Sequence, residues 1–188
     1  MVRELSYNTI SCVLGKSLWA MLDKCSTPRI APISPLAFLH ESLDTWELAR
    51  RRPDFDEFVG TTMLLKMFEM EPETKRVFGF SQDFEPTAEE LKKSGQLHIA
   101  TNILQRFDAS LNLMGPDYEL LEEILTELGK RHVGYGVKAH YFPFMGKAIV
   151  HAMAETLQDK WTPEANAAWT EVYQEISGTI MKSILIHS

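Results

Sequence analysis

The sequence is poor in cysteine, in long apolar runs and in positive charge, and each shortage excludes a class of protein. Its 188 residues include two cysteines, Cys12 and Cys25, which are too few for a disulfide framework, so we expect a reducing compartment. The longest apolar candidate, residues 10–22, is interrupted by Lys16 and is too short to span a membrane. The formal charge of -7 argues against binding to nucleic acid, which requires a basic face.

Several motifs of enzymes and of targeting signals are also missing. The sequence has no CxxC pair, no glycine-rich phosphate loop and no Ser/His/Asp pattern that helices would bring together. Hydrolytic or nucleotide-dependent catalysis therefore has no support. Neither an ordinary signal peptide nor a glycine after Met1 is present. We expect a cytoplasmic protein, or the intracellular domain of a larger membrane-associated one.

The sequence is rich in helical periodicity from Ser34 onward. Its 45% hydrophobic and 24% charged content is that of an ordinary globule with one domain. We predict an all-α domain of about eight helices over residues 34–188, without strands. The predicted helices cover about 35–52, 56–70, 72–78, 86 or 88–113, 121–132, 139–157 and 163–184.

Residues 1–33 stand apart from this domain. Val13, Leu14, Leu18 and Met21 suggest a short amphipathic helix, and a proline-containing linker follows it. We expect this extension to pack on the domain. The alternative is that it contacts a protein partner or a membrane surface.

One histidine ends an apolar helix in a way that suits a metal ligand. Leu121, Leu125 and Leu128 fall at helical spacing, and His132 continues the same face one turn further on. An imidazole in such an apolar slot can bind iron through one ring nitrogen. The other nitrogen would donate to a carbonyl of the preceding turn, for which Leu128 is the candidate.

A series of residues extends from Ser34 to about Ile186 in a characteristic order. They are Trp46, Gly60, Leu65-Lys66-Met67-Phe68, Pro72-Glu73-Thr74, Phe78, His132, Thr162-Pro163-Glu164 and Ala168-Trp169. In this order and spacing the chain resembles a globin. The resemblance implies a three-over-three helical sandwich that binds haem b.

The resemblance also assigns residues to the haem pocket. It implies that His132 is the proximal iron ligand, that Phe78 stacks on the porphyrin and that Leu64 lines the distal side. On the proximal side, Leu128 and Val137 would pack against the porphyrin. We also assign Phe142 to this haem-lining set.

Gly60 allows the register of the distal helix to be inferred. A glycine inside a helix costs about 1 kcal/mol, so a reason for its presence is expected. In globins the helix that carries this glycine crosses the distal helix so closely that only small residues fit. Ala100 is the small residue that we predict as its partner.

This register turns Ile99 toward the iron, where most globins carry a histidine, and places Ile103 on the same stripe. Turning His98 toward the iron instead would bury Asn102 and Arg106 without named partners, at a cost of several kcal/mol. The sequence therefore departs from the family at the distal position.

The predicted distal pocket of Leu64, Phe78, Ile99 and Ile103 has no donor for bound oxygen. Such a hydrogen bond contributes roughly 1.5–3 kcal/mol, or about one to two decades of affinity. Oxygen should therefore leave quickly. We predict a protein that binds O2, CO and NO at a five-coordinate iron, for gas sensing or redox signalling rather than oxygen storage. We also consider nitrite reduction as a side activity, so an enzymatic role stays open.

Two alternatives remain open at this point. In the first, His98 and His132 both bind the iron, and the six-coordinate haem serves electron transfer or scavenging. In the second, the fold has lost haem and acts as an interaction module. The presence of both His132 and Phe78 argues against the second alternative.

Overall fold

A computed structural model describes residues 35–188, and these residues form eight α-helices and two 3-10 turns with no strand among them. The elements are α2 (Pro35–Ala49), α3 (Phe55–Met70), α4 (Thr74–Val77), α5 (Ala88–Lys93), α6 (Gln96–Leu113), α7 (Tyr118–Gly134), η1 (Ala139–Tyr141), α8 (Phe142–Leu157), η2 (Gln158–Lys160) and α9 (Pro163–His187). The all-α prediction is confirmed. The extension predicted over residues 1–33 lies outside the described part of the chain.

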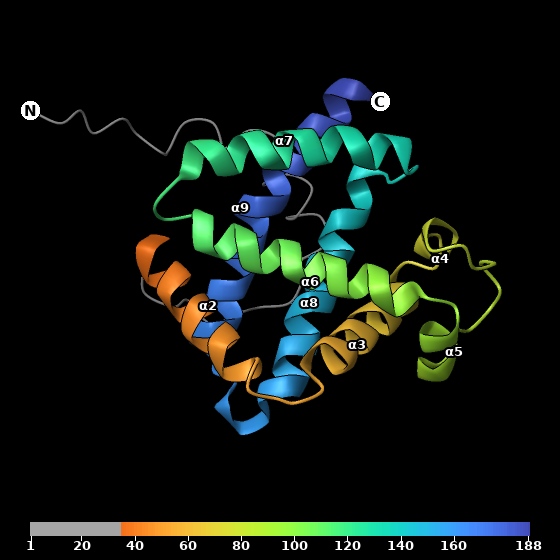
Figure 1. Ribbon diagram of the computed structural model, residues 1–188, viewed down its shortest axis with the longest axis horizontal. Coiled ribbons are helices and arrows are strands. Elements are labelled where there is room, and N and C mark those ends of the chain that lie inside the picture. Colours follow the sequence, from red (N-terminus) through yellow and green to blue (C-terminus); the bar gives the residue numbers. More distant parts are fainter. Residues whose placement is uncertain (1–34) are drawn as a thin grey trace, which may run out of the picture. The chain divides into compact units, whose positions relative to one another are not determined.

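Six of the helices are arranged in two layers (Figure 1). α2, α6 and α7 form one layer, and α3, α8 and α9 form the other. Between the layers α7 and α2 pack on α9, and α6 crosses α3. This is the predicted three-over-three sandwich. None of the helices within residues 35–188 is both long and apolar enough to cross a lipid bilayer.

The core is built around aromatic residues from three helices. Trp46 of α2, Phe107 of α6 and Trp169 of α9 are all buried. Phe107 stacks on Trp169 with ring centroids 5.4 Å apart, and Trp46 lies 5.7 Å from Trp169. The indole N–H of Trp169 donates to Thr45 Oγ1 at 2.9 Å, and that of Trp46 donates to Asp108 Oδ1 at 2.6 Å. Because each buried indole has a partner, the cluster holds α2 and α6 on α9 without an unpaired polar group.

The helix predicted over residues 86–113 is broken in the structure. α5 starts after Thr87, whose side chain accepts a hydrogen bond from the backbone at the third helical position. The chain then passes through Gly95, whose φ of 78° lies in the left-handed region that favours glycine. The prediction of one continuous helix was therefore wrong. The break places His98 and Ile99 in the first turn of a separate helix, α6.

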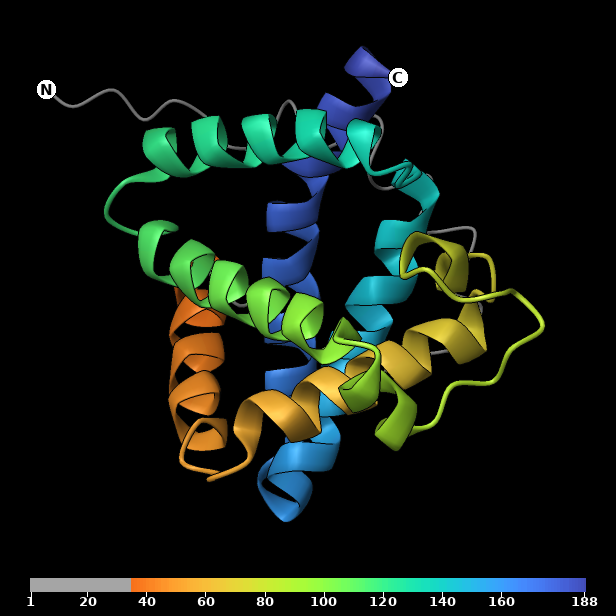
Figure 2. The same cartoon turned by 45° about the vertical axis from the view of Figure 1, so that its right-hand side comes forward.

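α6 and α7 are joined by a short turn and then diverge. Figures 1 and 2 show both helices leaving the turn at residues 114–117 and separating toward their far ends. The far end of α6 carries Ile99, and the far end of α7 carries His132. The two helices that hold the predicted distal and proximal residues therefore separate where those residues lie.

Candidate functional site

The end of α7 is shaped by a glycine that follows His132. Gly136 has a φ of 73°, and the amide of Val137 donates to the carbonyl of His132 at 3.0 Å. This six-to-one hydrogen bond closes the helix in a Schellman arrangement. Val137, which the sequence assigns to the haem pocket, is thereby held close to the backbone of His132.

The imidazole of His132 is oriented by its own helix. Its Nδ1 lies 2.8 Å from the carbonyl oxygen of Leu128. Since a carbonyl can only accept, Nδ1 carries the hydrogen and Nε2 keeps a lone pair. The ring is half-buried and lies 5.6 Å from the ring of Phe142. The contact predicted between His132 and Leu128 is confirmed.

The surroundings of His132 favour the neutral imidazole. Burial of the ring lowers its pKa, and the positive charge of Arg106 lowers that pKa further, whereas the contact with the Leu128 carbonyl raises it. Burial is the largest of these effects. Because metal ions bind the neutral ring, the site holds this histidine in the form that a metal requires.

The register of α6 is set where it crosses α3. A Cβ added at Gly60 would lie 2.9 Å from the Cβ of Ala100, and both residues are buried. The predicted close contact is therefore confirmed. Leu64, one turn beyond Gly60, has no exposed surface. Ile99 and Ile103 precede and follow Ala100 on α6. Ile99 is 39% exposed, and Ile103 is half-buried.

Phe78 follows α4 and is buried against α3. Its ring meets that of Phe68 edge-on, with centroids 5.3 Å apart. The loop that follows is tied back to α4 by Lys75, whose Nζ donates to Glu85 Oε1 at 2.6 Å and to the carbonyl of Gln82 at 3.2 Å. Lys75 is only 1% exposed, although a lysine in a short helix is ordinarily expected in solvent.

A second tie joins α4 to the segment after α7. Glu73 Oε2 accepts hydrogen bonds from Lys138 Nζ and from the Tyr141 hydroxyl, both at 3.0 Å. The bond from Lys138, followed by that from Tyr141, lowers the pKa of Glu73. Nothing in the sequence pattern identified this contact, because Lys138 and Tyr141 lie 65 and 68 residues after Glu73 in the chain.

The structure brings the predicted site residues together in two groups. The proximal group lies around the end of α7 and the start of α8, and comprises Leu128, His132, Val137 and Phe142. The distal group flanks the crossing of α3 and α6, and comprises Leu64, Ile99 and Ile103. Phe78 is buried beside α3, and His98 is exposed in the first turn of α6.

These residues fit a flat apolar cofactor that carries its own metal. Ile99 on α6 is 39% exposed, so an apolar ligand beside this helix would have an apolar side chain to cover. Within residues 35–188 no three His, Cys, Asp or Glu side chains are grouped so as to hold a metal ion. A metal bound to His132 would therefore need its remaining ligands from a macrocycle.

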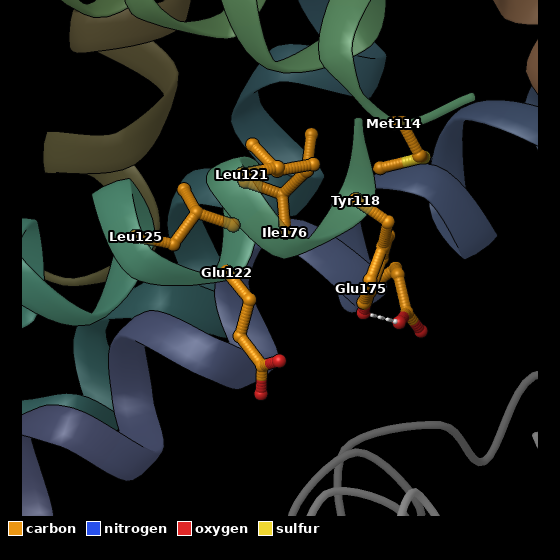
Figure 3. A pocket seen from close by; sticks show the side chains of 7 residues that line it. All are labelled: Met114, Tyr118, Leu121, Glu122, Leu125, Glu175 and Ile176. Atoms are coloured by element: carbon orange, nitrogen blue, oxygen red, sulfur yellow. Dashed lines mark hydrogen bonds between the residues drawn. The ribbon is translucent and has the colours of Figure 1, made fainter. Parts of the chain in front are cut away.

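A separate gap between α7 and α9 is not part of this site. Figure 3 shows the side chains that line it, among them Leu121, Leu125 and Ile176. The Tyr118 hydroxyl closes one side by donating to Glu175 Oε1 at 2.5 Å. The side chains leave essentially no free volume in the gap, so it has no room for a ligand.

Comparison with known proteins identifies the family. Residues 61–180 match the family model for globins. The chain is similar to neuroglobin-2 of Oncorhynchus mykiss, with 27% identity over 61% of this chain and 71% of that protein. It is also similar to an anaerobic nitrite reductase of Physcomitrium patens, with 28% identity over 71% of this chain and 72% of that protein.

Solved structures share the fold. A hexacoordinated haem protein from an anhydrobiotic tardigrade superposes with a TM-score of 0.68 and 22% identity, over 85% of this chain and 99% of that one. A hexa-coordinate haemoglobin of Drosophila melanogaster gives a TM-score of 0.63 and 23% identity, over 77% of this chain and 92% of that one. With the family match covering most of the chain and a histidine presented at the end of α7 on the expected sandwich, the chain belongs to the globin family of haem-binding proteins.

Proposed function

We propose that the chain binds haem b between α6 and α7, with Nε2 of His132 as the proximal iron ligand. The lone pair at Nε2 and the pairing of Nδ1 with Leu128 support this role. Leu128, Val137 and Phe142 would cover the proximal face, and Phe78 would stack on the porphyrin. Haem supplies an iron that binds diatomic gases and changes oxidation state.

The observation that carries the distal assignment is the contact between Gly60 and Ala100. A Cβ at Gly60 would lie 2.9 Å from that of Ala100, so Ala100 faces α3, which supports the proposal that its neighbour Ile99 would face the haem pocket. An isoleucine offers no hydrogen-bond donor. We therefore propose a pocket that takes O2, CO or NO and releases O2 quickly.

Rapid release suits gas sensing or redox signalling better than oxygen storage. A store needs a ligand that stays bound until its concentration falls, and the missing donor costs about one to two decades of oxygen affinity. Nitrite is a further candidate substrate, because one similar protein is named as an anaerobic nitrite reductase. This reduction is proposed as a secondary activity.

The visible spectrum of the reduced protein, reconstituted with haem, tests the proposal. A broad single band in the visible region is expected for a five-coordinate iron with an apolar distal side. A protein that takes up no stoichiometric haem would instead act as a haem-free interaction module. That result would refute the proposal, since His132 would then have no ligand role.

A second candidate function places His98 on the iron opposite His132. It is favoured by the position of His98 in the first turn of α6, directly after the left-handed break at Gly95. A helix end can unwind more easily than a helix middle. Two proteins of similar structure are described as hexacoordinate, the tardigrade haem protein and the Drosophila haemoglobin. Such a protein would transfer electrons or scavenge reactive ligands.

One substitution separates the two candidates. Under the second candidate, the reduced wild type shows a sharp split pair of bands, and His98→Ala converts it to the broad five-coordinate spectrum. Under the first candidate, His98→Ala leaves the reduced spectrum unchanged. His40→Ala, which removes an exposed histidine of α2, serves as the matched control.

A further inference from the structure

α7 and α9 make an unusually close contact one turn before His132. A Cβ added at Gly129 would lie 2.5 Å from the Cβ of Ser183 and 2.7 Å from the carbonyl oxygen of Ile180. Real Cβ atoms essentially never approach other atoms this closely. By contrast, a Cβ at Gly178 on α9 would meet nothing within 4 Å. The close approach of the two helices therefore requires glycine at 129.

Ser183 of α9 also forms a hydrogen bond with the same turn of α7. Its hydroxyl donates to the carbonyl oxygen of Thr126 at 2.6 Å, and the residue is 3% exposed. Thr126 lies three residues before Gly129, so the hydroxyl and the Cβ of one residue contact neighbouring points on one turn. Without this partner the buried hydroxyl would be left without a hydrogen bond, so the contact holds Ser183 against this turn of α7.

This turn supplies the atoms that orient the imidazole. Leu128, whose carbonyl accepts from Nδ1, is adjacent to Gly129, and His132 follows three residues later. Ordinary contact begins at 3.4 Å, so a Cβ at 129 would force the helices apart by about 1 Å. His132 would move with α7, whereas Phe142, against which its ring packs, belongs to α8.

We infer that Gly129 and Ser183 are positioning residues for the proximal ligand. They set the distance of α7 from α9 and, through it, the placement of Nε2 in the pocket. The inference rests on the proposed role of His132. It states that the α7–α9 contact controls how tightly, and at what angle, Nε2 of His132 meets the iron.

The test uses the haem-reconstituted full chain and the variants Gly129→Ala and Gly178→Ala. The readouts are the iron–histidine stretching band in resonance Raman spectra, taken just after CO photolysis, and the rate of haem transfer to a haem-free acceptor. For Gly129→Ala we expect a shifted band and haem loss at least about ten times faster, the change that 1.4 kcal/mol of strain produces. Gly178→Ala should match the wild type.

A compensating variant sharpens the test. Gly129→Ala combined with Ser183→Gly removes the Cβ and hydroxyl of Ser183, but the carbonyl of Ile180 stays in the way. We therefore expect partial recovery of the band and of the haem-transfer rate. If Gly129→Ala does not fold, Ser183→Ala carries the test, because it keeps the Cβ and removes only the bond to Thr126.

The outcomes distinguish this inference from the proposed function. A wild type that binds no haem refutes both. A wild type that binds haem through His132, with a Gly129→Ala or Ser183→Ala variant that loses thermal stability but keeps the band and transfer rate, refutes only the positioning role. In that case the close contact would serve the fold alone.

Discussion

The proximal and distal sides of the pocket are held in different ways. On the proximal side, α7 is capped by Gly136, packed on α9 at Gly129 and bonded internally from His132 to Leu128. On the distal side, α6 begins after a break at Gly95, and His98 and Ile99 of its first turn are exposed. The comparison teaches that the proposed iron ligand is held by several contacts along α7, whereas the residue proposed to lie opposite it is in the first turn of α6, close to the crossing with α3.

The largest effect is expected when the proposed proximal ligand, His132, is removed. His132→Gly should abolish stoichiometric haem uptake, because it removes the imidazole that we propose as the proximal iron ligand. Titration with haem at the Soret maximum measures the uptake. Added imidazole should restore part of it by occupying the space of the missing ring. Uptake that is undiminished without imidazole would contradict the assignment.

The next largest effect is expected at the contact between α3 and α6 that sets the register of α6. Gly60→Ala should destabilise the fold by about 1–3 kcal/mol, since the new Cβ would lie 2.9 Å from that of Ala100. Urea unfolding measures the change. Gly178→Ala is the matched control and should be neutral or stabilising by up to about 1 kcal/mol.

The exchange variant makes this prediction more stringent. Gly60→Ala combined with Ala100→Gly moves one methyl group across the contact, so most of the lost stability should return. If the double variant is no more stable than Gly60→Ala, the two positions do not meet as described, and the assignment of Ile99 loses its support.

A third prediction tests whether the residue on the distal side faces the bound gas. Ile99→His should supply the missing donor and raise oxygen affinity about 10–100-fold, whereas CO affinity should change much less. Flash photolysis of the CO form in mixed gases measures both. Equal changes for the two gases would mean that the side chain at 99 does not face the ligand.

The smallest effect concerns the tie between α4 and the segment after α7. Lys138 and Tyr141 lower the pKa of Glu73, so the folded state loses their contribution as the pH falls below the ordinary value of 4.5 toward the lowered pKa. Glu73→Gln should reduce stability above this window and flatten its pH dependence within it. Glu123→Gln, at an exposed position of α7, should leave the unfolding curve against pH unchanged.

Much of the fold and part of the site follow from local pattern. The helix boundaries agree with the predicted ones to within a few residues over most of the described chain. Thr162 caps α9 by accepting from the amide of Ala165 at 3.0 Å, as its position before Pro163 suggests. The contact of Gly60 with Ala100 was predictable because the resemblance to globins implies that this glycine meets a small residue of the distal helix.

The same argument could have been applied to two other glycines. Gly95 lies inside the stretch whose helical periodicity suggested one continuous helix over residues 86–113. In the structure it marks the break between α5 and α6. Gly129 lies inside α7 and marks its closest approach to α9. Sequence reasoning did not identify their roles, because a glycine signals that something is unusual without saying what meets it.

Lys75 and Glu73 were beyond prediction for a different reason. A charged residue in a short helix is ordinarily solvated, and the burial of Lys75 depends on Glu85 and Gln82 folding back over it. The partners of Glu73 lie far along the chain. Such contacts are set by the path of loops, which periodicity does not encode.

The sequence by itself determined the helical content, the membership of His132 in an apolar helix face and the small residues that allow α3 and α6 to touch. These depend on spacing and caps, which act over about four residues along one helix. Only the tertiary structure decided that α7 rests on α9 at Gly129, that α6 begins at Gly95 and that Glu73 joins α4 to the chain after α7. These features depend on how separate helices meet, because the distance between two helices is set by the side chains of both.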